Sequence, residues 1–201
     1  MKEGDASLTE ANRLAKKAVA LDDTDSYAQW SLGCTYLCGR RYRNSRFHLA
    51  KALELNPNDV EARALHGLFL TYIGQTDEAL AEYEQAKKVD PHHLAWLPWY
   101  QGFTYFTALR FNEAIEILEP IEQPANEVRG VLAASYALVG RLEEANLMLG
   151  SFLRAAEDEM VDFPGRSAAA WMQNWHSVVP YKNDADRQVW VDGLRKAGLD
   201  P

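Results

Sequence analysis

The sequence has 201 residues, 47% of them hydrophobic and 25% charged. This balance is typical of a folded protein and excludes a disordered chain. The formal net charge of −8 argues against a general nucleic-acid or anionic-membrane binder, because phosphate groups require a basic surface. The longest uncharged run, residues 94–109, is too short to span a bilayer, and the charged N-terminus lacks the apolar region of a signal peptide. We therefore expect a cytoplasmic protein that binds neither nucleic acid nor membrane.

The first expected element is a lone helix over residues 8–22. A capping-box pattern from Ser7 to Glu10 marks its start. Its apolar and small positions follow a helical period and are Leu14, Ala15, Ala18 and Leu21. In the register of the segments that follow, this is a second helix with no first helix before it. That arrangement favours a chain cut from a longer parent over an unusual cap.

Four segments then repeat one pattern, in which two helices are separated by a short turn. They span residues 26–59, 60–93, 95–125 and 126–156. The small residue where two antiparallel helices would cross closely moves from Gly33 to Gly67, a step of 34 residues. A small residue of the second helix moves by the same step, from Ala18 to Ala52 to Ala86. Four segments in phase predict a repeat architecture.

The third and fourth segments keep the pattern with small changes. The third carries its crossing residue, Gly102, one position late, and Pro120 and Pro124 are expected to shorten its second helix. The whole pattern resembles the tetratricopeptide repeat (TPR), whose units cannot bury their apolar faces alone. We predict an all-α fold, a right-handed TPR superhelix (α-solenoid) with two extra C-terminal helices.

The C-terminal part, residues 157–201, is expected to be a loop followed by two capping helices that pack on the array. An acidic run and a Pro-Gly pair predict the loop. The helices are predicted over residues 167–176 and 184–197, and Gly198 provides a stop for the second. This tail is rich in tryptophan, with Trp171, Trp175 and Trp190.

Two motifs of the tail, residues 180–186 and 193–199, are similar to the end of TPR regions in bacterial class III adenylate/guanylate cyclases. Related tails occur in winged-helix regulators that carry the same repeats. In that family the repeats follow a catalytic or DNA-binding domain, and neither domain is present in this sequence. The resemblance implies a regulatory or scaffolding part of a larger signalling protein.

The first helices of a TPR array line its concave groove, and here that lining is predicted to be aromatic and aliphatic. The expected groove residues are Tyr27, Trp30, Cys34, Leu37, Ala64, Leu68, Tyr72, Trp96, Trp99, Phe103 and Phe106. Grooves that clamp acidic peptide tails carry Lys, Arg and Asn instead, so a carboxylate clamp is disfavoured. Aromatic anchors favour an apolar helix of a protein partner, or the chain's own tail docking through Trp171, Trp175 and Trp190. Self-association through the third segment, as a homodimer or other homo-oligomer, and a sensor for an apolar small molecule are the alternatives.

The sequence offers no catalytic or metal site. Phosphate-loop, zinc-protease and hydrolase motifs are missing from it, so we expect no enzyme activity and no cofactor. Any cyclase activity would lie in a domain absent from this chain. Cys34 and Cys38 share a helix face, but a structural zinc site needs four ligands, and we expect reduced thiols. The basic cluster Arg40, Arg41, Arg43 and Arg46 is either a solvated convex face or a docking site for an acidic partner.

Overall fold

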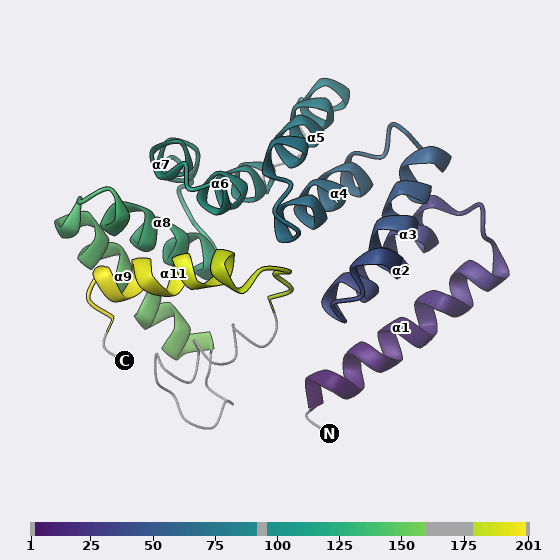
Figure 1. Cartoon of the computed structure of the whole chain (residues 1–201), viewed down its shortest axis with the longest axis horizontal. Helices are drawn as coiled ribbons and strands as arrows, with labels where there is room; N and C mark the ends of the chain where they lie inside the picture. The colour runs from purple at the N-terminus through teal and green to yellow at the C-terminus, as the bar shows by residue number, and fades with distance from the viewer. Residues whose placement is uncertain (1–2, 92–95, 160–178, 200–201) are drawn as a thin grey trace. The chain divides into compact units, whose positions relative to one another are not determined.

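The computed structural model describes residues 3–91, 96–159 and 179–199. Every regular element within those ranges is a helix, and there are ten of them (Figure 1). The helices are α1 (Glu3–Leu21), α2 (Ser26–Cys38), α3 (Tyr42–Leu55), α4 (Val60–Tyr72), α5 (Thr76–Val89), α6 (Leu97–Thr107), α7 (Phe111–Leu118), α8 (Asn126–Leu138), α9 (Leu142–Glu159) and α11 (Asp184–Lys196). Within each unit neighbouring helices pack against each other, as α2 does on α3, α4 on α5 and α8 on α9, in the manner of a TPR-type α-solenoid. The all-α prediction is confirmed.

The chain divides into two compact units. The first comprises Met1–Leu97 and Pro180–Lys182, and the second comprises Pro98–Val179 and Asn183–Pro201.

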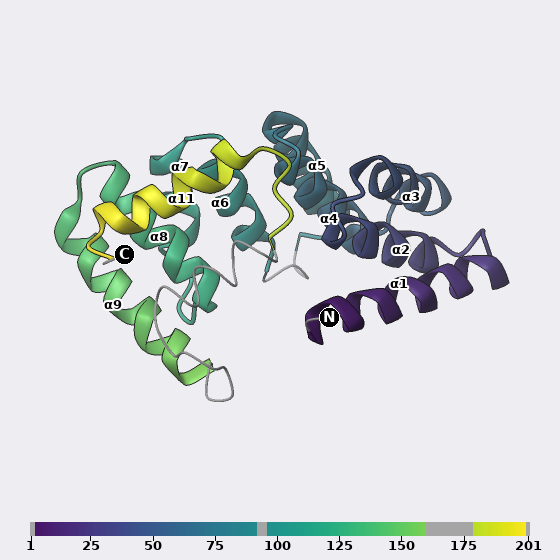
Figure 2. The same ribbon diagram turned by 60° about the horizontal axis from the view of Figure 1, so that its bottom comes forward.

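In the first unit, α2 pairs with α3 and α4 pairs with α5, while α1 lies beside α2 (Figure 2). The two crossings are close because glycine occupies both. A Cβ added at Gly33 would lie 2.7 Å from Cγ of Leu49, and one added at Gly67 would lie 2.5 Å from Cε1 of Tyr83. Both distances are far below ordinary contact, so a side chain at either glycine would push its pair apart.

The same turn closes the first helix of each pair. The second residue after the helix has a positive φ, and it is Arg40, Gly74, Leu109 or Gly140. The next backbone N–H then donates to a carbonyl five residues earlier, as Arg41 does to Tyr36 at 2.8 Å and Gln75 does to Leu70 at 2.9 Å. This is the Schellman motif, which satisfies carbonyl groups that the helix end leaves without partners. This turn reverses the direction of the chain between the two helices of a pair.

The second unit holds α6 to α9 and α11, apart from Leu97 at the start of α6. Helix α7 has only eight residues, and a turn follows it directly, as the prolines predicted. Helix α11 packs on α8 (Figure 1). A Cβ added at Gly130 of α8 would lie 2.8 Å from Trp190, and one added at Gly193 would lie 2.6 Å from Ala134, so glycine permits this packing from both sides.

The predicted helix ends differ from the observed ones at two places. Helix α1 begins at Glu3, five residues before the predicted start. Helix α9 continues to Glu159, where a loop was expected from residue 157, because Glu and Asp do not stop a helix that meets no proline before Pro164. The predicted helix over 184–197 is present as α11. The predicted helix over 167–176 lies outside the described residues.

Candidate interaction surfaces

The first helices α2 and α4 are neighbours in the first unit, and α2 presents an aromatic pair. Tyr27 is 62% exposed, and its ring lies 4.6 Å from that of the half-buried Trp30 in an edge-to-face arrangement. Asp25 caps the helix, because its carboxylate accepts a hydrogen bond from the Tyr27 backbone at 2.8 Å. The start of α2 is therefore fixed while the tyrosine ring faces solvent.

One turn further along α2, Cys34 is half-buried and Cys38 is exposed, and the two thiols are free. Burial, reinforced by the charge of Cys38, raises the pKa of Cys34 to about 12, and burial also raises the pKa of Cys38. Both thiols therefore stay protonated at neutral pH. Within the described ranges, no three His, Cys, Asp or Glu side chains gather as a metal site.

On α4, the predicted groove residues Leu68 and Tyr72 are half-buried. Tyr72 meets Tyr181, with ring centroids 5.3 Å apart in an edge-to-face arrangement. The backbone of this tail segment is also held, because Lys182 N donates to the carbonyl oxygen of Tyr72 at 2.8 Å. The carbonyl oxygen of Tyr181 accepts from Nη1 of Arg40 at 3.1 Å and from the hydroxyl of Tyr42 at 3.0 Å.

Residues 180–182 belong to the first unit, and Tyr181, which is only 1% exposed, is part of its core. Sequence reasoning quoted this tyrosine within a tail motif but gave it no role. The available signal was its type, since a large aromatic residue next to a proline in a polar stretch is uncommon without a packing partner.

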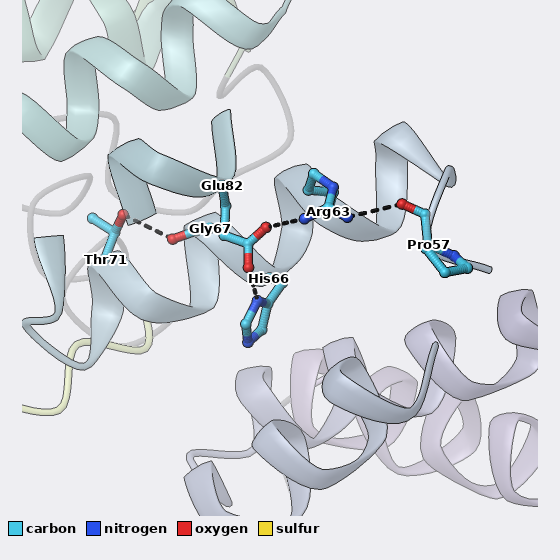
Figure 3. A network of polar contacts seen from close by, with 6 residues as sticks. All are labelled: Pro57, Arg63, His66, Gly67, Thr71 and Glu82. Atoms are coloured by element: carbon cyan, nitrogen blue, oxygen red, sulfur yellow. Dashed lines mark hydrogen bonds and ion pairs between the residues drawn. The ribbon is translucent and has the colours of Figure 1, made fainter. Parts of the chain in front are cut away.

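A polar network fixes α4 against α5 (Figure 3). Glu82 binds Nη1 of Arg63 at 2.6 Å and Nδ1 of His66 at 3.0 Å, and Arg63 also donates to the carbonyl of Pro57 at 2.8 Å. Burial of Glu82 disfavours its charged form, but the hydrogen bonds and charges of His66 and Arg63 outweigh it and hold the pKa of this carboxyl below its usual range. On the same helix, Thr71 donates to the carbonyl of Gly67 at 3.0 Å.

The predicted groove residues of the third segment do not share one environment. Trp96 and Trp99 are half-buried, and the ring of Trp99 lies 5.6 Å from that of Tyr100. In contrast, Phe103 is 7% exposed and Phe106 is fully buried beside Phe111. Phe103 and Phe106 therefore belong to the core of the second unit, which leaves neither ring available to a partner. Leu37 and Ala64 are likewise buried.

Of the three tail tryptophans, the structure describes Trp190. It is 1% exposed and packs edge-on against Phe152, 6.1 Å away, in the second unit. It thus docks on the helices of the fourth segment. Trp171 and Trp175 lie outside the described residues.

The basic cluster lies at the turn before α3 and in the first turns of that helix. The guanidinium of Arg41 lies 4.8 Å from the ring of Tyr36, and that of Arg46 lies 5.4 Å from the ring of Phe69. Arg43 and Arg46 line a shallow hollow on α3 together with the exposed Phe47. Several of these cations therefore contribute to packing, and docking of an acidic partner stays a prediction.

Comparison with known proteins agrees with the internal period. Residues 60–93, which include α4 and α5, match the family model for the tetratricopeptide repeat. A search of curated proteins found no match. The chain thus contains a TPR unit, a type of repeat that serves protein–protein interaction and scaffolding in general. In the part of the chain that the structure describes, no helix is long and apolar enough to cross a membrane.

Proposed function

We propose that this chain is a protein–protein interaction module that binds a helical segment of a partner through the first helices of its first unit. We call the binding residues the aromatic surface, and they are Tyr27, Trp30, Cys34, Leu68 and Tyr72. The observation that carries the proposal is the Tyr27–Trp30 pair. A tyrosine exposed by 62% and in contact with a tryptophan on an otherwise ordered helix is the kind of anchor that dominates protein interfaces.

The chemistry of the aromatic surface favours an apolar helix as the ligand. None of its five residues is charged, and the two thiols of α2 stay protonated at neutral pH. An acidic peptide tail would find no cation among them. An amphipathic helix can instead bury its apolar face against the rings of Tyr27 and Trp30.

The chain's own tail competes for one end of this surface in our proposal. Tyr181 packs on Tyr72, and the backbone of residues 181 and 182 is held by three hydrogen bonds. A partner that needs Tyr72 must displace this segment, whereas a partner that uses only Tyr27 and Trp30 need not. Occupancy by the tail would therefore regulate how much of the surface a partner can reach.

The experiment is a selection of helical peptides from a random library against the full chain. The selected peptides are expected to be apolar on one face and to bind Tyr27→Ala and Trp30→Ala at least about tenfold more weakly. Leu147→Ala is the matched control, because Leu147 is 77% exposed on α9 of the second unit. Acidic peptides, or equal binding to all four proteins, would contradict the proposal.

Tyr27→Ala carries the most weight in this test, because an exposed side chain can be removed with little effect on folding. Trp30 is half-buried, so its variant needs a thermal melt beside the binding data. If the Trp30→Ala protein melts like the wild type and still loses binding, the loss comes from the missing contact with the peptide and not from unfolding.

We further propose that the module is the regulatory part of a larger cytoplasmic signalling protein. The tail motifs similar to those of cyclase-associated TPR regions support this, and no catalytic role is proposed for the present residues. The genomic sequence upstream of the codon for Met1 tests the idea. An in-frame cyclase or winged-helix domain is expected, and a stop codon directly upstream would contradict it.

A further inference from the structure

Helix α3 and the turn before it have the opposite charge to their counterparts in the next repeat. Residues 40–51 contain five Arg and Lys residues and no Asp or Glu. Their counterparts one step of 34 residues later, 74–85, contain four Asp and Glu residues and no Arg or Lys. Because the whole chain has a net charge of −8, residues 40–51 are a local exception that the repeat itself does not require.

The stability of α3 does not explain its arginines. The N-terminal end of a helix carries a partial positive charge, so carboxylates stabilise it and cations destabilise it. Helix α5 follows this rule with Asp77 and Glu78 in its first turn, whereas α3 has no acidic residue there and has Arg43. Arg43 thus lowers the stability of its own helix, which is typical of residues that serve binding.

The carboxylate that accompanies the turn arginine in later segments is missing at α3. Arg110 and Arg141 each lie over a tyrosine ring and each bind the glutamate three residues later, at 2.8 and 2.9 Å. Arg41 lies over a tyrosine ring in the same way, but the residue three positions later is Asn44, which has no charge. The first repeat therefore has the cation without the carboxylate.

Two of the cations line the shallow hollow on α3, which we call the basic hollow. Its lining residues are Arg43, Arg46, Phe47, Ala50, Lys51 and Glu54. At one end Lys51 binds Glu54 at 3.2 Å. Arg43 is at the other end, about 16 Å away along the helix axis, so Glu54 is too distant to neutralise it. No carboxylate of the described residues pairs with Arg43.

Arg46 is fixed in position without losing its charge. Its Nη2 donates a hydrogen bond to Oε1 of Gln75, and its guanidinium lies 5.4 Å from the ring of Phe69. Both partners are uncharged. The basic hollow therefore contains one cation that is already ordered and a second, Arg43, that is exposed one turn before it.

Phe47 places an aromatic ring beside these cations. Its side chain is 65% exposed, and its ring lies 5.0 Å from that of His48. The residues one step of 34 to either side, Arg13 and Ala81, are exposed as well, so this register position faces solvent on α1, α3 and α5. Aromatic and arginine side chains that lie together on a surface are typical of protein interfaces.

We propose that the basic hollow docks an acidic segment of a partner protein that also carries an apolar side chain. Its carboxylates pair with Arg43 and Arg46, and its apolar side chain packs on Phe47. Charge complementarity identifies this partner, because the cations have no carboxylate of their own and the exposed ring lies next to them. This surface is on α3, so it is separate from the aromatic surface and does not depend on it.

The spacing within the basic hollow specifies the segment further. Arg43 and Phe47 are about 6 Å apart along the helix axis. Two residues of an extended chain span about the same distance and place their side chains on one side. An extended segment with a carboxylate and an apolar residue two positions apart therefore fits the hollow.

The test uses the full chain and a fluorescein-labelled peptide, Gly-Glu-Asp-Glu-Phe-Glu-Asp-Gly, with binding measured by anisotropy. The peptide is expected to bind with a Kd below about 1 mM at about 0.05 M NaCl and to be released at about 0.5 M. Arg43→Glu should weaken binding at least about tenfold. Lys88→Glu is the matched control, because it changes the net charge equally at an exposed residue of α5.

The apolar contact is tested separately. Phe47→Ala should weaken binding at least about fivefold. Leu147→Ala is its control, because Leu147 is exposed at the corresponding place of α9, two residues after Ala145 as Phe47 is after Ser45. Tyr27→Ala should bind the peptide like the wild type, which separates this surface from the aromatic surface.

Both key variants should fold, since Arg43 and Phe47 are exposed, and thermal melts check this. Arg43→Glu is expected to melt no lower than the wild type, because a carboxylate suits the start of a helix. A lower melting temperature would overturn the proposal, since Arg43 would then stabilise the fold itself.

The binding data can overturn the proposal in other ways. No binding at about 1 mM peptide would do so. So would equal weakening by Arg43→Glu and Lys88→Glu, which would mean attraction to net charge alone, or unchanged binding by Phe47→Ala. Vesicles of phosphatidylserine or a single-stranded oligonucleotide are tried in the same assay. If either binds more tightly than the peptide and is lost in Arg43→Glu, a membrane or a nucleic acid is the ligand and the proposal is wrong.

Discussion

The repeats of residues 26–59 and 60–93 have the same helix–turn–helix arrangement but differ in the side chains that stabilise it. The crossing is Gly33 on Leu49 in one and Gly67 on Tyr83 in the other. The left-handed turn residue is Arg40 in one and Gly74 in the other.

The polar contact across the pair also differs. Residues 26–59 use a bond between His48 and Gln29, whereas residues 60–93 use an ionic network around Glu82. The comparison teaches that small crossing residues and a fixed turn define the repeat, while the polar contact across it can change. The family match falls on residues 60–93, whose turn carries Gly74.

The largest effect should come from closing the space at the crossings. Gly67→Ala is expected to lower the free energy of unfolding by about 2–3 kcal/mol, because the new Cβ would meet the rigid ring of Tyr83. Gly33→Ala should cost less, about 1–2 kcal/mol, because Leu49 can change rotamer. Urea denaturation followed by circular dichroism measures both. An equal or reversed order would show that the two crossings do not differ in rigidity.

The next largest effect concerns the network of Figure 3. Glu82→Gln is expected to lower the free energy of unfolding by about 1–2 kcal/mol, because Arg63 stays one-fifth exposed without its carboxylate. Glu84→Gln, which breaks an exposed pair with Lys87 on the same helix, should change it by less than about 0.5 kcal/mol. If both variants lose the same free energy of unfolding, the network around Glu82 stabilises its repeat no more than an exposed ion pair does.

Acid should destabilise the two repeats in different pH ranges. Burial lowers the pKa of His48 from 6.5, so the unfolded state binds the proton first and stability falls as the pH drops through that ordinary value. The pKa of Glu82 is lowered from 4.5, so its contribution is full above that ordinary value and is lost as the pH falls below it. Denaturation at several pH values measures this. His48→Gln should remove the loss of stability that begins near pH 6.5, and Glu82→Gln should remove the loss that begins near pH 4.5. A wild-type stability that is constant across both ranges would contradict this.

The smallest effect concerns the turn. Gly74→Ala is expected to lower the free energy of unfolding by about 1 kcal/mol, because φ is 82° there. Leu109→Gly should raise it by about 0.5–1 kcal/mol, since an exposed leucine has a φ of 60°. Arg40→Gly should fall between them, because it relieves the backbone but removes the hydrogen bond to Tyr181. Thermal melts of the three variants give the order, and a stabilising Gly74→Ala would refute the argument.

Much of the fold could be predicted because small residues recur at a fixed interval, and small residues are required where two helices cross closely. Gly33 and Gly67 recur at a step of 34 residues, as do Ala52 and Ala86, and the structure places each of them at a close contact or in the core. The left-handed turns at Arg40 and Leu109 could not be predicted, because neither residue type favours that conformation.

The candidate site was less predictable. Periodicity identifies an apolar face but not which neighbour covers it, so Phe103 and Phe106 were indistinguishable from Tyr27 in the sequence although the structure buries only the phenylalanines. The role of Tyr181 depends on a contact with residues about 140 positions earlier, which no local pattern records.

The contact of Tyr181 has a consequence for the order of folding. Helical repeats form through contacts between near neighbours, which close quickly, but the bond from Arg40 to Tyr181 spans 141 residues. On the ribosome, residues 1–97 are synthesised long before Tyr181 emerges. We therefore expect the end of the aromatic surface at Tyr72 to be open on the nascent chain and to close only after synthesis ends, so a partner present during translation would meet a surface that the finished protein partly covers.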